Sequence, residues 1–431
     1  INDRPAPDPI DQVADGAAGE QARGETRPGR CRCPLRAEHE GQECIVLRDP
    51  GGYAASMVVL PRGLVEIVAL FDGANSVVDI QAAVMRKHGE LITRQHIEEL
   101  VEALDGHGFL DSPRFAELRQ GIDGAFLASA SRPASHAGGA YPETADALRQ
   151  TFDRFFDPPE GPGPIAEGRA APPSVKAVVA PHIDFHRGGP AYAWAYRDVA
   201  ERCDADLFII FGTCHAGMAD PFALTRKDYE TPLGAAAVDR DVVEALATRA
   251  GQDCFASELA HRVEHSIEFQ AVFLRYLFAG RREVTIVPVL TSFAHEALAR
   301  GKRADDDPRV GRFLDAVADV VATRGRRVAL IAGADLAHVG PRFGDPERVT
   351  PAGLAAIARE DREMLEAVAA GDADGVFDAV ARDGDRRRIC GVSPIYALLR
   401  VIGSGQGALR RYGQWPDPDA VVTFASVVFD E

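Results

Sequence analysis

Four stretches of the sequence place an imidazole, a thiol or a carboxylate where an element is expected to end or begin. His182 follows the apolar run VKAVVA, His215 follows DLFIIFG, and Asp335 and His338 follow RVALIAG. An arginine-rich stretch brings Cys390 to the start of a helix-like segment. Because the carboxyl ends of buried parallel strands lie at one edge of an α/β sheet, these metal-ligating and acid–base residue types are predicted to converge on one site.

A further cluster fits a different chemistry. His261, Glu264 and His265 match the inverted zincin motif HxxEH, in which two histidines on one helical face bind zinc and the glutamate serves as the base. The downstream glutamate ligand that this motif needs is not identifiable in the sequence. A metallopeptidase is therefore an alternative function, and the segment is interpreted as a helix that walls the pocket.

The cysteines pose a second question about metal binding. Cys31 and Cys33, with His39 and Cys44 close by, suggest a zinc site, but their spacing matches no standard zinc knuckle. The chain has seven cysteines, an odd number, which favours free thiols in a reducing compartment over a disulfide framework. A cytoplasmic location is therefore expected.

Length and charge limit the function classes. The chain has 431 residues, enough for two domains and a large core. A formal net charge of -17 and a pI near 5.2 argue against nucleic-acid and anionic-membrane partners, since both require clustered Lys and Arg. No run approaches the ~18 uninterrupted apolar residues of a membrane span, and no signal-like segment opens the chain.

The N-terminal third is predicted to be separate from the rest. Residues 1–30 contain few large apolar side chains and are expected to be a disordered tail. Residues 31–120 are predicted to form a small domain and 121–131 a linker, which leaves 132–431 as the second domain. The small domain is expected to have a short strand from Cys44, a short closing strand at 109–110 and three helices, at 61–72, 76–88 and 93–107.

This small domain resembles the PqqD-like winged-helix domains. The resemblance lies in the initial strand, in the helices around LFDG (70–73) and in the closing GFLD (108–111). Between residues 31 and 120 there are nine Lys and Arg against fourteen Asp and Glu, a net charge of -5, which disfavours DNA. Docking of a peptide or a partner protein is therefore expected, with a purely stabilising appendage as the alternative.

From residue 175 onward, strand-like and helix-like runs alternate. This alternation predicts an α/β sheet with helices on both faces. Strands are predicted at 175–180, 206–211, 283–290, 327–332 and 420–429, and helices at 190–202, 239–250, 264–278, 310–324, 351–369, 373–381 and 393–402.

The second domain also carries a family resemblance. The motifs RPASHAGGAYP, APHIDFHRGG, FGTCHAG, AHRVEHSIEFQ, GADLAHVGPRFG and ICGVSPI occur in the order found in the Memo family, whose bacterial members are called AmmeMemoRadiSam system protein B. The resemblance implies a fold similar to the LigB-type class III extradiol dioxygenases, which use non-haem iron. It also implies partners, namely an AMMECR-type protein and a radical SAM protein.

Position by position, the resemblance implies that His182, His215 and Cys390 are metal ligands. It places Asp335 and His338 in the same pocket as residues that orient a ligand or carry a proton, and His265 in the EHSIE stretch. Two imidazoles and a thiolate suit iron, copper or zinc and do not suit magnesium or calcium. Three protein ligands leave an open coordination position, as in a reactive site.

The sequence departs from the family motifs at two places. Cys214 stands where the family usually has a histidine beside the second ligand, and Asp184 and His186 are added after the first ligand. Either addition could lie in the site or on the surface. Two functions follow as hypotheses. One is a metal-dependent, redox-active enzyme that uses iron or copper. The other is a non-catalytic module that binds a peptide or protein.

Overall fold

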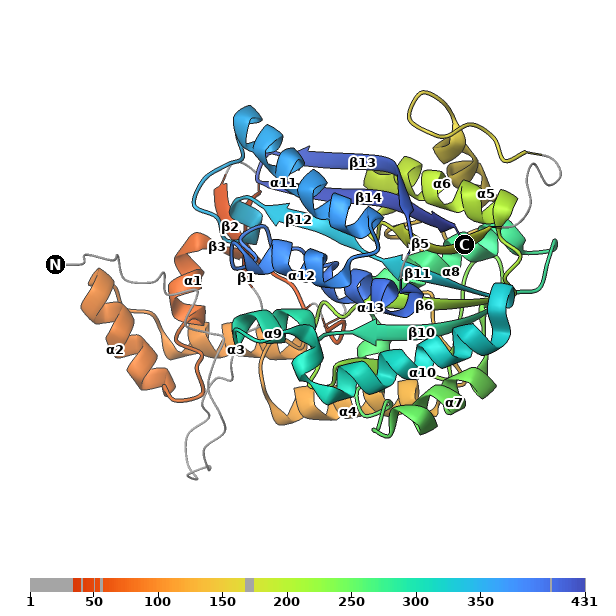
Figure 1. Cartoon of the computed structure of the whole chain (residues 1–431). Helices are drawn as coiled ribbons and strands as arrows, with labels where there is room; N and C mark the ends of the chain where they lie inside the picture. The colour runs from red at the N-terminus through yellow and green to blue at the C-terminus, as the bar shows by residue number, and fades with distance from the viewer. Residues whose placement is uncertain are drawn as a thin grey trace. The chain divides into compact units, whose positions relative to one another are not determined.

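The computed structural model describes residues 34–39, 42–49, 51–54, 57–166, 174–403 and 405–430. The chain divides into two compact units, Ile1–Ala128 and Ser129–Glu431 (Figure 1). The predicted tail and the pair Cys31 and Cys33 lie outside the described residues.

The first unit combines a small antiparallel sheet with four helices. Its strands β1 (Pro34–His39), β2 (Gln42–Leu47) and β3 (Val58–Pro61) lie in that order in the sheet. Its helices are α1 (Arg62–Val68), α2 (Val77–His88), α3 (Arg94–Gly106) and α4 (Pro113–Ala128). The first three are the helices that the sequence predicts. Helix α4 runs into the predicted linker, which is therefore helical as far as Ala128.

Local signals set the limits of α2. The Ser76 side chain accepts from the Asp79 N–H, and the Asp79 carboxylate accepts from the Ser76 N–H at 2.9 Å, which forms a capping box. Gly89 ends the helix with a φ of 68°, where glycine is favoured. One apolar cluster of the sheet and helices forms the core of this unit and includes Ile45, Leu60, Phe71, Ile80, Ile97, Leu104 and Phe109.

The second unit is built on a mixed sheet with the order β12-β14-β5-β11-β6-β10-β7; β13 also pairs with β14, and β9 with β10. Its central strands β5, β11, β6 and β10 run parallel, and β14 runs antiparallel to β5. The strands are β5 (Val175–Ala180), β6 (Leu207–Thr213), β7 (Phe222–Leu224), β9 (Ala237–Val238), β10 (Thr285–Thr291), β11 (Val328–Gly333), β12 (Asp335–Val339), β13 (Gly407–Asp417) and β14 (Ala420–Asp430). A separate short pair joins β4 (Ser131–Arg132) to β8 (Asp228–Tyr229).

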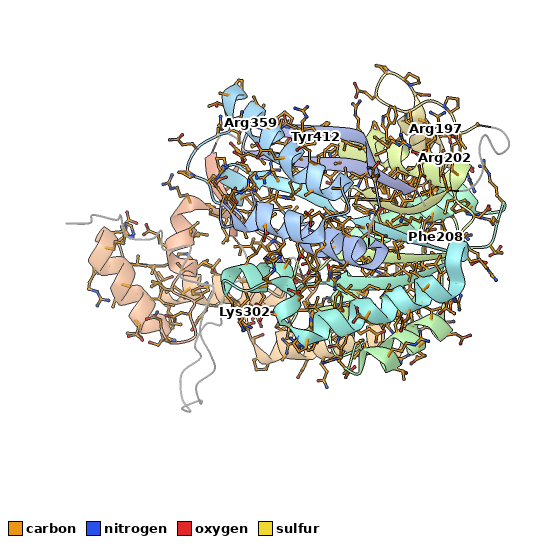
Figure 2. All side chains as sticks on the ribbon, in the orientation of Figure 1. Arg197, Arg202, Phe208, Lys302, Arg359 and Tyr412 are labelled. Atoms are coloured by element: carbon orange, nitrogen blue, oxygen red, sulfur yellow. The ribbon has the colours of Figure 1, made fainter. Side chains whose placement is uncertain are left out.

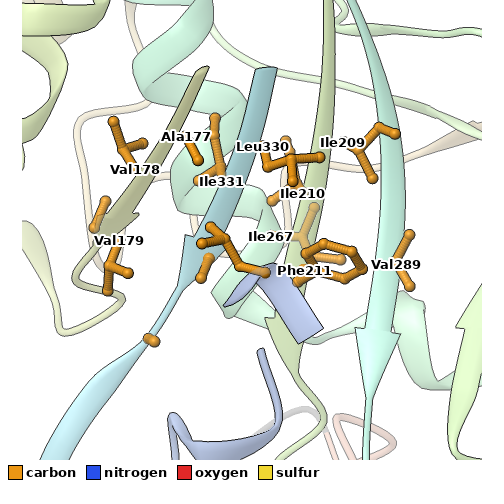
Figure 3. Packing of buried hydrophobic residues seen from close by; sticks show 14 of the residues in the cluster. Ala177, Val178, Val179, Ile209, Ile210, Phe211, Ile267, Val289, Leu330 and Ile331 are labelled. Carbon is orange, nitrogen blue, oxygen red and sulfur yellow. The ribbon is translucent and has the colours of Figure 1, made fainter. Parts of the chain in front are cut away.

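Helices cover both faces of this sheet. Figures 1 and 3 show α13 in front of the central strands and α8 behind them, where Ile267 packs beside Phe211. The helices are α5 (Ala145–Asp153), α6 (Phe185–Arg202), α7 (Arg240–Ala250), α8 (His265–Phe278), α9 (Ala294–Ala299), α10 (Pro308–Arg324), α11 (Pro351–Ala369), α12 (Ala373–Ala381) and α13 (Val392–Ile402). The predicted α/β class is confirmed.

Two predictions about the second unit need correction. No strand was predicted directly after 327–332, but Asp335 and His338 lie on strand β12, whose pairing with β14 shifts register between them. Strand β13 was not predicted, because its sequence GALRRYGQWPD contains charged residues and a proline and lacks an apolar run. It pairs with β14 along its length and is only partly buried.

None of the helices in the described part of the chain combines the length and the apolarity needed to cross a lipid bilayer.

Candidate metal centre

His182 lies directly beyond the carboxyl end of β5, with 1% of its surface exposed. Its Nδ1 lies 2.9 Å from the carbonyl oxygen of Gly333 at the end of β11. A carbonyl oxygen only accepts, so Nδ1 carries the proton and Nε2 keeps its lone pair. Burial and the neighbouring His215 lower the pKa of His182 to about 3. The ring is therefore neutral and presents Nε2 as a potential ligand atom.

His215 follows β6 and is held by the carboxylate of Glu264. The His215 backbone N–H donates to Oε2 at 2.8 Å, and its Nδ1 lies 3.0 Å from Oε1. Burial would raise the pKa of Glu264, but the charge and hydrogen bonds of His215 bring it well below the usual value. Burial would lower the pKa of His215, but Glu264 brings it well above the usual value. With Nδ1 engaged, Nε2 is the nitrogen left for a ligand.

Cys390 brings a thiol to these rings from the loop before α13. Its Sγ lies 3.2 Å from His182 Nε2 and also hydrogen-bonds His215. The Gly391 N–H donates to the Asp335 carbonyl oxygen at 3.1 Å, and a Cβ at Gly391 would lie 2.3 Å from that oxygen. Only glycine lets the loop approach β12 so closely. Burial raises the pKa of the Cys390 thiol, and His215 opposes that shift.

A third imidazole reaches the same point from the first turn of α8. One ligand-capable atom from each of His182, His215 and His265 lies within 4.8 Å of the other two. The His265 ring centroid is 4.6 Å from that of His215 and 5.4 Å from that of His182. Burial lowers the pKa of His265 well below the usual value, so it is neutral as well. These three histidines, here called the imidazole cluster, are the group of possible ligands found among the described residues, and the Cys390 thiol lies beside His182 and His215.

Asp335 and His338 also lie at this edge of the sheet. Asp335 is buried, accepts from the His182 N–H at 2.9 Å and places its Oδ2 3.7 Å from His182 Nε2. Burial raises the pKa of Asp335 to about 6, close to neutral pH. His338 has its Nδ1 3.1 Å from the Leu336 carbonyl oxygen, and burial lowers its pKa. The residues predicted for the site therefore lie on adjoining elements, namely the loops after β5 and β6, strand β12, the loop before α13 and the first turn of α8.

The three residues that set this sequence apart from the family motifs stay outside the group of candidate ligands found among the described residues. Asp184 pairs with Arg187 at 2.6 Å on the first turn of α6. The His186 ring packs 6.3 Å from that of Trp415. Cys214 is buried, and burial raises the pKa of its thiol to about 12.

The HxxEH motif, which left a metallopeptidase as an alternative, does not form the arrangement that a zincin needs. His261 belongs to a 3-10 turn at Glu258–Arg262, whereas α8 begins at His265, so the two histidines do not share a helical face. The His261 ring is fully buried, with Nδ1 2.8 Å from the Tyr229 hydroxyl and Nε2 3.0 Å from the Ala223 carbonyl oxygen. Both nitrogens are engaged by the protein, so His261 has no free ligand atom.

A further buried carboxylate beside the site, that of Glu268, was not predicted from the sequence. Glu268, one turn after Glu264 on α8, pairs with Arg132 at 2.5 Å, and both side chains are 0% exposed. It also accepts from the Tyr141 hydroxyl, and its Oε2 lies 2.7 Å from His136 Nδ1. Burial would raise the pKa of Glu268, but Arg132 and His136 bring it to about 2. The sequence offered one signal for this carboxylate: Glu264 and Glu268, one before and one after His265, are four residues apart and so lie on the same side of a helix.

Arg132 connects this carboxylate to the start of α8. Its guanidinium donates to the carbonyl oxygens of His261 and Glu264, both at 2.9 Å. The buried ion pair therefore holds the segment that carries Glu264 and His265. His136, tied to Glu268, places its ring 5.7 Å from His265 and is partly exposed, so it forms the outer side of the imidazole cluster.

Known proteins resemble this chain over most of its length. A family model described as Memo-like protein matches residues 132–428. A MEMO1 family protein of Aquifex aeolicus is 27% identical over 389 residues, which cover 89% of this chain and 95% of that protein. A MEMO1 family protein of Methanosarcina mazei is 30% identical over 302 residues, which cover 68% of this chain and 97% of that protein. A solved structure of an uncharacterized protein from Escherichia coli K12 covers 59% of this chain and 99% of its own, at 12% identity and a TM-score of 0.34.

The buried pair predicts an acid-dependent loss of stability. The pKa of Glu268 is about 2 in the folded protein against an ordinary value of 4.5, so its stabilising effect is complete above pH ~4.5 and is lost as the pH falls towards 2. Glu268→Gln should lower the free energy of unfolding by about 3 kcal/mol at pH 7, because Arg132 is left unpaired. Urea denaturation should show this difference shrinking between pH 4.5 and pH 3. Glu230→Gln, at an exposed carboxylate, is the control; an equal loss in both variants would contradict the assignment.

Proposed function

The chain belongs to the Memo-like family, and we propose that it is a metal-dependent, redox-active enzyme with one iron or copper ion on His182, His215 and Cys390. Zinc is the redox-inert alternative for the same ligands. The observation that carries the proposal is the 3.2 Å approach of Cys390 Sγ to His182 Nε2, with His215 hydrogen-bonded to the same thiol. These three side chains come from positions 182, 215 and 390 and meet at the carboxyl edge of one sheet.

The residues present fit such an ion. His182 and His215 each have Nδ1 engaged by a protein acceptor, which leaves Nε2 on both rings for ligation. A thiol beside them completes a set of two nitrogens and one sulfur, which matches metals of borderline softness. When bound, iron or copper would supply Lewis acidity and one-electron redox chemistry.

The chain's own side chains supply the remaining chemistry. Asp335, with its pKa raised to about 6, is suited to take up and release a proton near neutral pH. His338 and His265 are further candidates for proton transfer, since burial lowers the pKa of both and leaves them neutral. Glu264 holds His215 in one orientation, and Glu268 with Arg132 holds the helix end from which His265 projects.

Finer assignments are also part of the proposal. The mixed α/β sheet with its site at the carboxyl edge supports a LigB-like fold, and the family supports the role of AmmeMemoRadiSam system protein B. An AMMECR-type protein and a radical SAM protein are then the proposed partners, and the cytoplasm the proposed location. We assign a PqqD-like winged-helix fold to the first unit, supported by its three strands and following helices.

A second function, peptide or protein binding, is favoured by the surface of the first unit. Large apolar side chains are exposed there, including Met57 at 64%, Val78 at 52% and Leu91 at 71%. Val78 and Met85 are seven residues apart and lie on one face of α2. Exposed apolar side chains that share a helix face can bind another chain.

Loss of ligands should abolish metal binding. His182→Ala and Cys390→Ser should each reduce bound iron or copper from about one equivalent to a small fraction, because a two-donor remnant is a poor site. Metal analysis of protein purified without oxygen measures this. His186→Ala, at a histidine that packs on Trp415, is the matched control and should retain full occupancy. Full stoichiometry in both ligand variants would disprove the proposal.

Glu264 should increase the affinity of the site for its metal ion. Glu264→Gln weakens the hold on the His215 ring, and such changes to residues behind a ligand reduce metal affinity about 10–100-fold. Competition with a chromophoric chelator gives the dissociation constant. Glu258→Gln, which alters a carboxylate bonded to Thr225 in the same unit, provides the comparison. Equal affinities in both variants and the wild type would show that Glu264 does not orient a ligand.

The exposed apolar side chains of the first unit, among them Met85 and Leu91, should be required for binding a partner. Leu91→Asp together with Met85→Asp should reduce recovery of a partner from the native host without altering the metal content of the second unit. Affinity purification followed by mass spectrometry measures recovery. Asp substitution of the exposed Leu409 in the second unit provides the control. Unchanged recovery with the double variant would remove the support for this surface.

A further inference from the structure

A buried carboxylate on α11 connects the elements that carry the thiol and the acid–base residues. Asp361 is 0% exposed and has three donors: the Arg387 guanidinium, the Thr423 hydroxyl at 2.6 Å and the Tyr412 hydroxyl at 2.9 Å. Figure 2 labels Tyr412 on β13, where α11 crosses the sheet. Burial raises the pKa of Asp361, and these donors oppose that shift.

Arg387 belongs to the loop that ends at Cys390. Its carbonyl oxygen accepts from the His338 N–H at 2.7 Å, and Arg388 donates back to the His338 carbonyl oxygen at 3.1 Å. Two hydrogen bonds therefore join this loop to β12, one at the backbone N–H of His338 and one at its carbonyl oxygen. A third, from the Gly391 N–H to the Asp335 carbonyl oxygen, follows the thiol.

The same carboxylate reaches β12 by a second route. The Thr423 hydroxyl donates to Asp361 and accepts from the Ala337 N–H at 2.8 Å. Asp361 thus holds both the loop, through Arg387, and the strand, through Thr423. Besides the direct hydrogen bonds between the loop and β12, one side chain therefore connects the loop that carries Cys390 to the Asp335–His338 strand.

The backbone of the loop explains why it needs such an anchor. Asp385 and Arg388 have φ values of 56° and 51°, and they are the only non-glycine residues with positive φ among those that the structure describes. Side chains disfavour this conformation, and it persists only where surrounding contacts enforce it. Asp345 holds Arg388 from outside the site, and Asp361 holds Arg387 from within the core.

We propose that Asp361 is a positioning residue that keeps the Cys390 thiol within reach of His182 by anchoring the loop 383–390 to β12. The reason for positioning the thiol rests on the proposed metal function, whereas the contacts of Asp361 do not depend on it. Without the Asp361 anchor, the loop leaves its strained conformation more often, and the thiol, which is already partly exposed, becomes more accessible while the rest of the sheet stays folded.

The test compares Asp361→Asn with Asp198→Asn. Asp198 is also a carboxylate between arginines, Arg202 at 2.8 Å and Arg410 at 2.7 Å, but it lies 13 residues into α6, about 20 Å from its first turn. Metal-free full-length protein is treated with iodoacetamide, and peptide mass spectrometry gives the alkylation rates of Cys390 and of Cys254. Cys254 is buried away from the loop, so its rate reports global unfolding.

Asp361→Asn should raise the ratio of the Cys390 rate to the Cys254 rate about tenfold, and Asp198→Asn should leave it unchanged. Thr423→Val, which keeps the Arg387 contact and removes the link to Ala337, should give a smaller increase. If Asp361→Asn does not fold, Thr423→Val and Tyr412→Phe carry the test. An unchanged ratio, or an equal rise in the Asp198 control, would overturn the proposal.

A Co²⁺ titration adds a readout of the thiolate itself. Asp361→Asn should lower Co²⁺ affinity about 10–100-fold and weaken the thiolate-to-cobalt charge-transfer band. Loss of thermal stability with an intact band would show a purely structural role and overturn the proposal. If wild-type protein takes up no Co²⁺, the proposed metal function fails, and the thiol ratio alone decides whether Asp361 positions Cys390.

Discussion

The orientation of two imidazole rings determines what this edge of the sheet can do. His182 and His215 each have Nδ1 engaged, one by a backbone carbonyl oxygen and the other by the Glu264 carboxylate. Because only Nε2 remains on each ring, the two lone pairs or protons are directed to the space beside Cys390 Sγ. If either acceptor were absent, the ring could rotate, and the thiol would have no fixed partner.

The charges around these rings follow from the same arrangement. Four ionisable side chains lie close together, and His182 and Glu264 among them are buried, so few of the four can be charged at once. His182 and His265 are kept neutral, while His215 and Glu264 form a pair that favours the charged form of both. Neutral imidazole is the form that binds metals, and Glu264 is the acceptor that compensates positive charge there, whether a proton or an ion carries it.

The sequence predicted those strands and helices whose limits depend on local residue patterns. The buried strand β5 and the helices α11 and α12 have the predicted limits, because apolar periodicity and start and stop signals specify them. Glu268 had only its helical spacing from Glu264 as a signal, and Asp361 had none, since nothing local distinguishes a buried carboxylate from a solvated one. His261 shows the opposite failure. Its spacing suggested a ligand, but tertiary contacts occupy both of its nitrogens.

The distances within the site are set by backbone contacts rather than by flexible side chains. A Cβ on Gly333 would lie 2.6 Å from the Ser266 carbonyl oxygen, so the end of β11 touches the start of α8 only because residue 333 has no side chain. Gly391 allows the same closeness between the Cys390 loop and β12. The backbones of helix α8 and of the thiol loop therefore pack closely against opposite faces of the sheet, and this packing fixes their positions relative to the strands. The imidazoles and the thiol are short side chains, so the position of the backbone largely determines where their donor atoms meet.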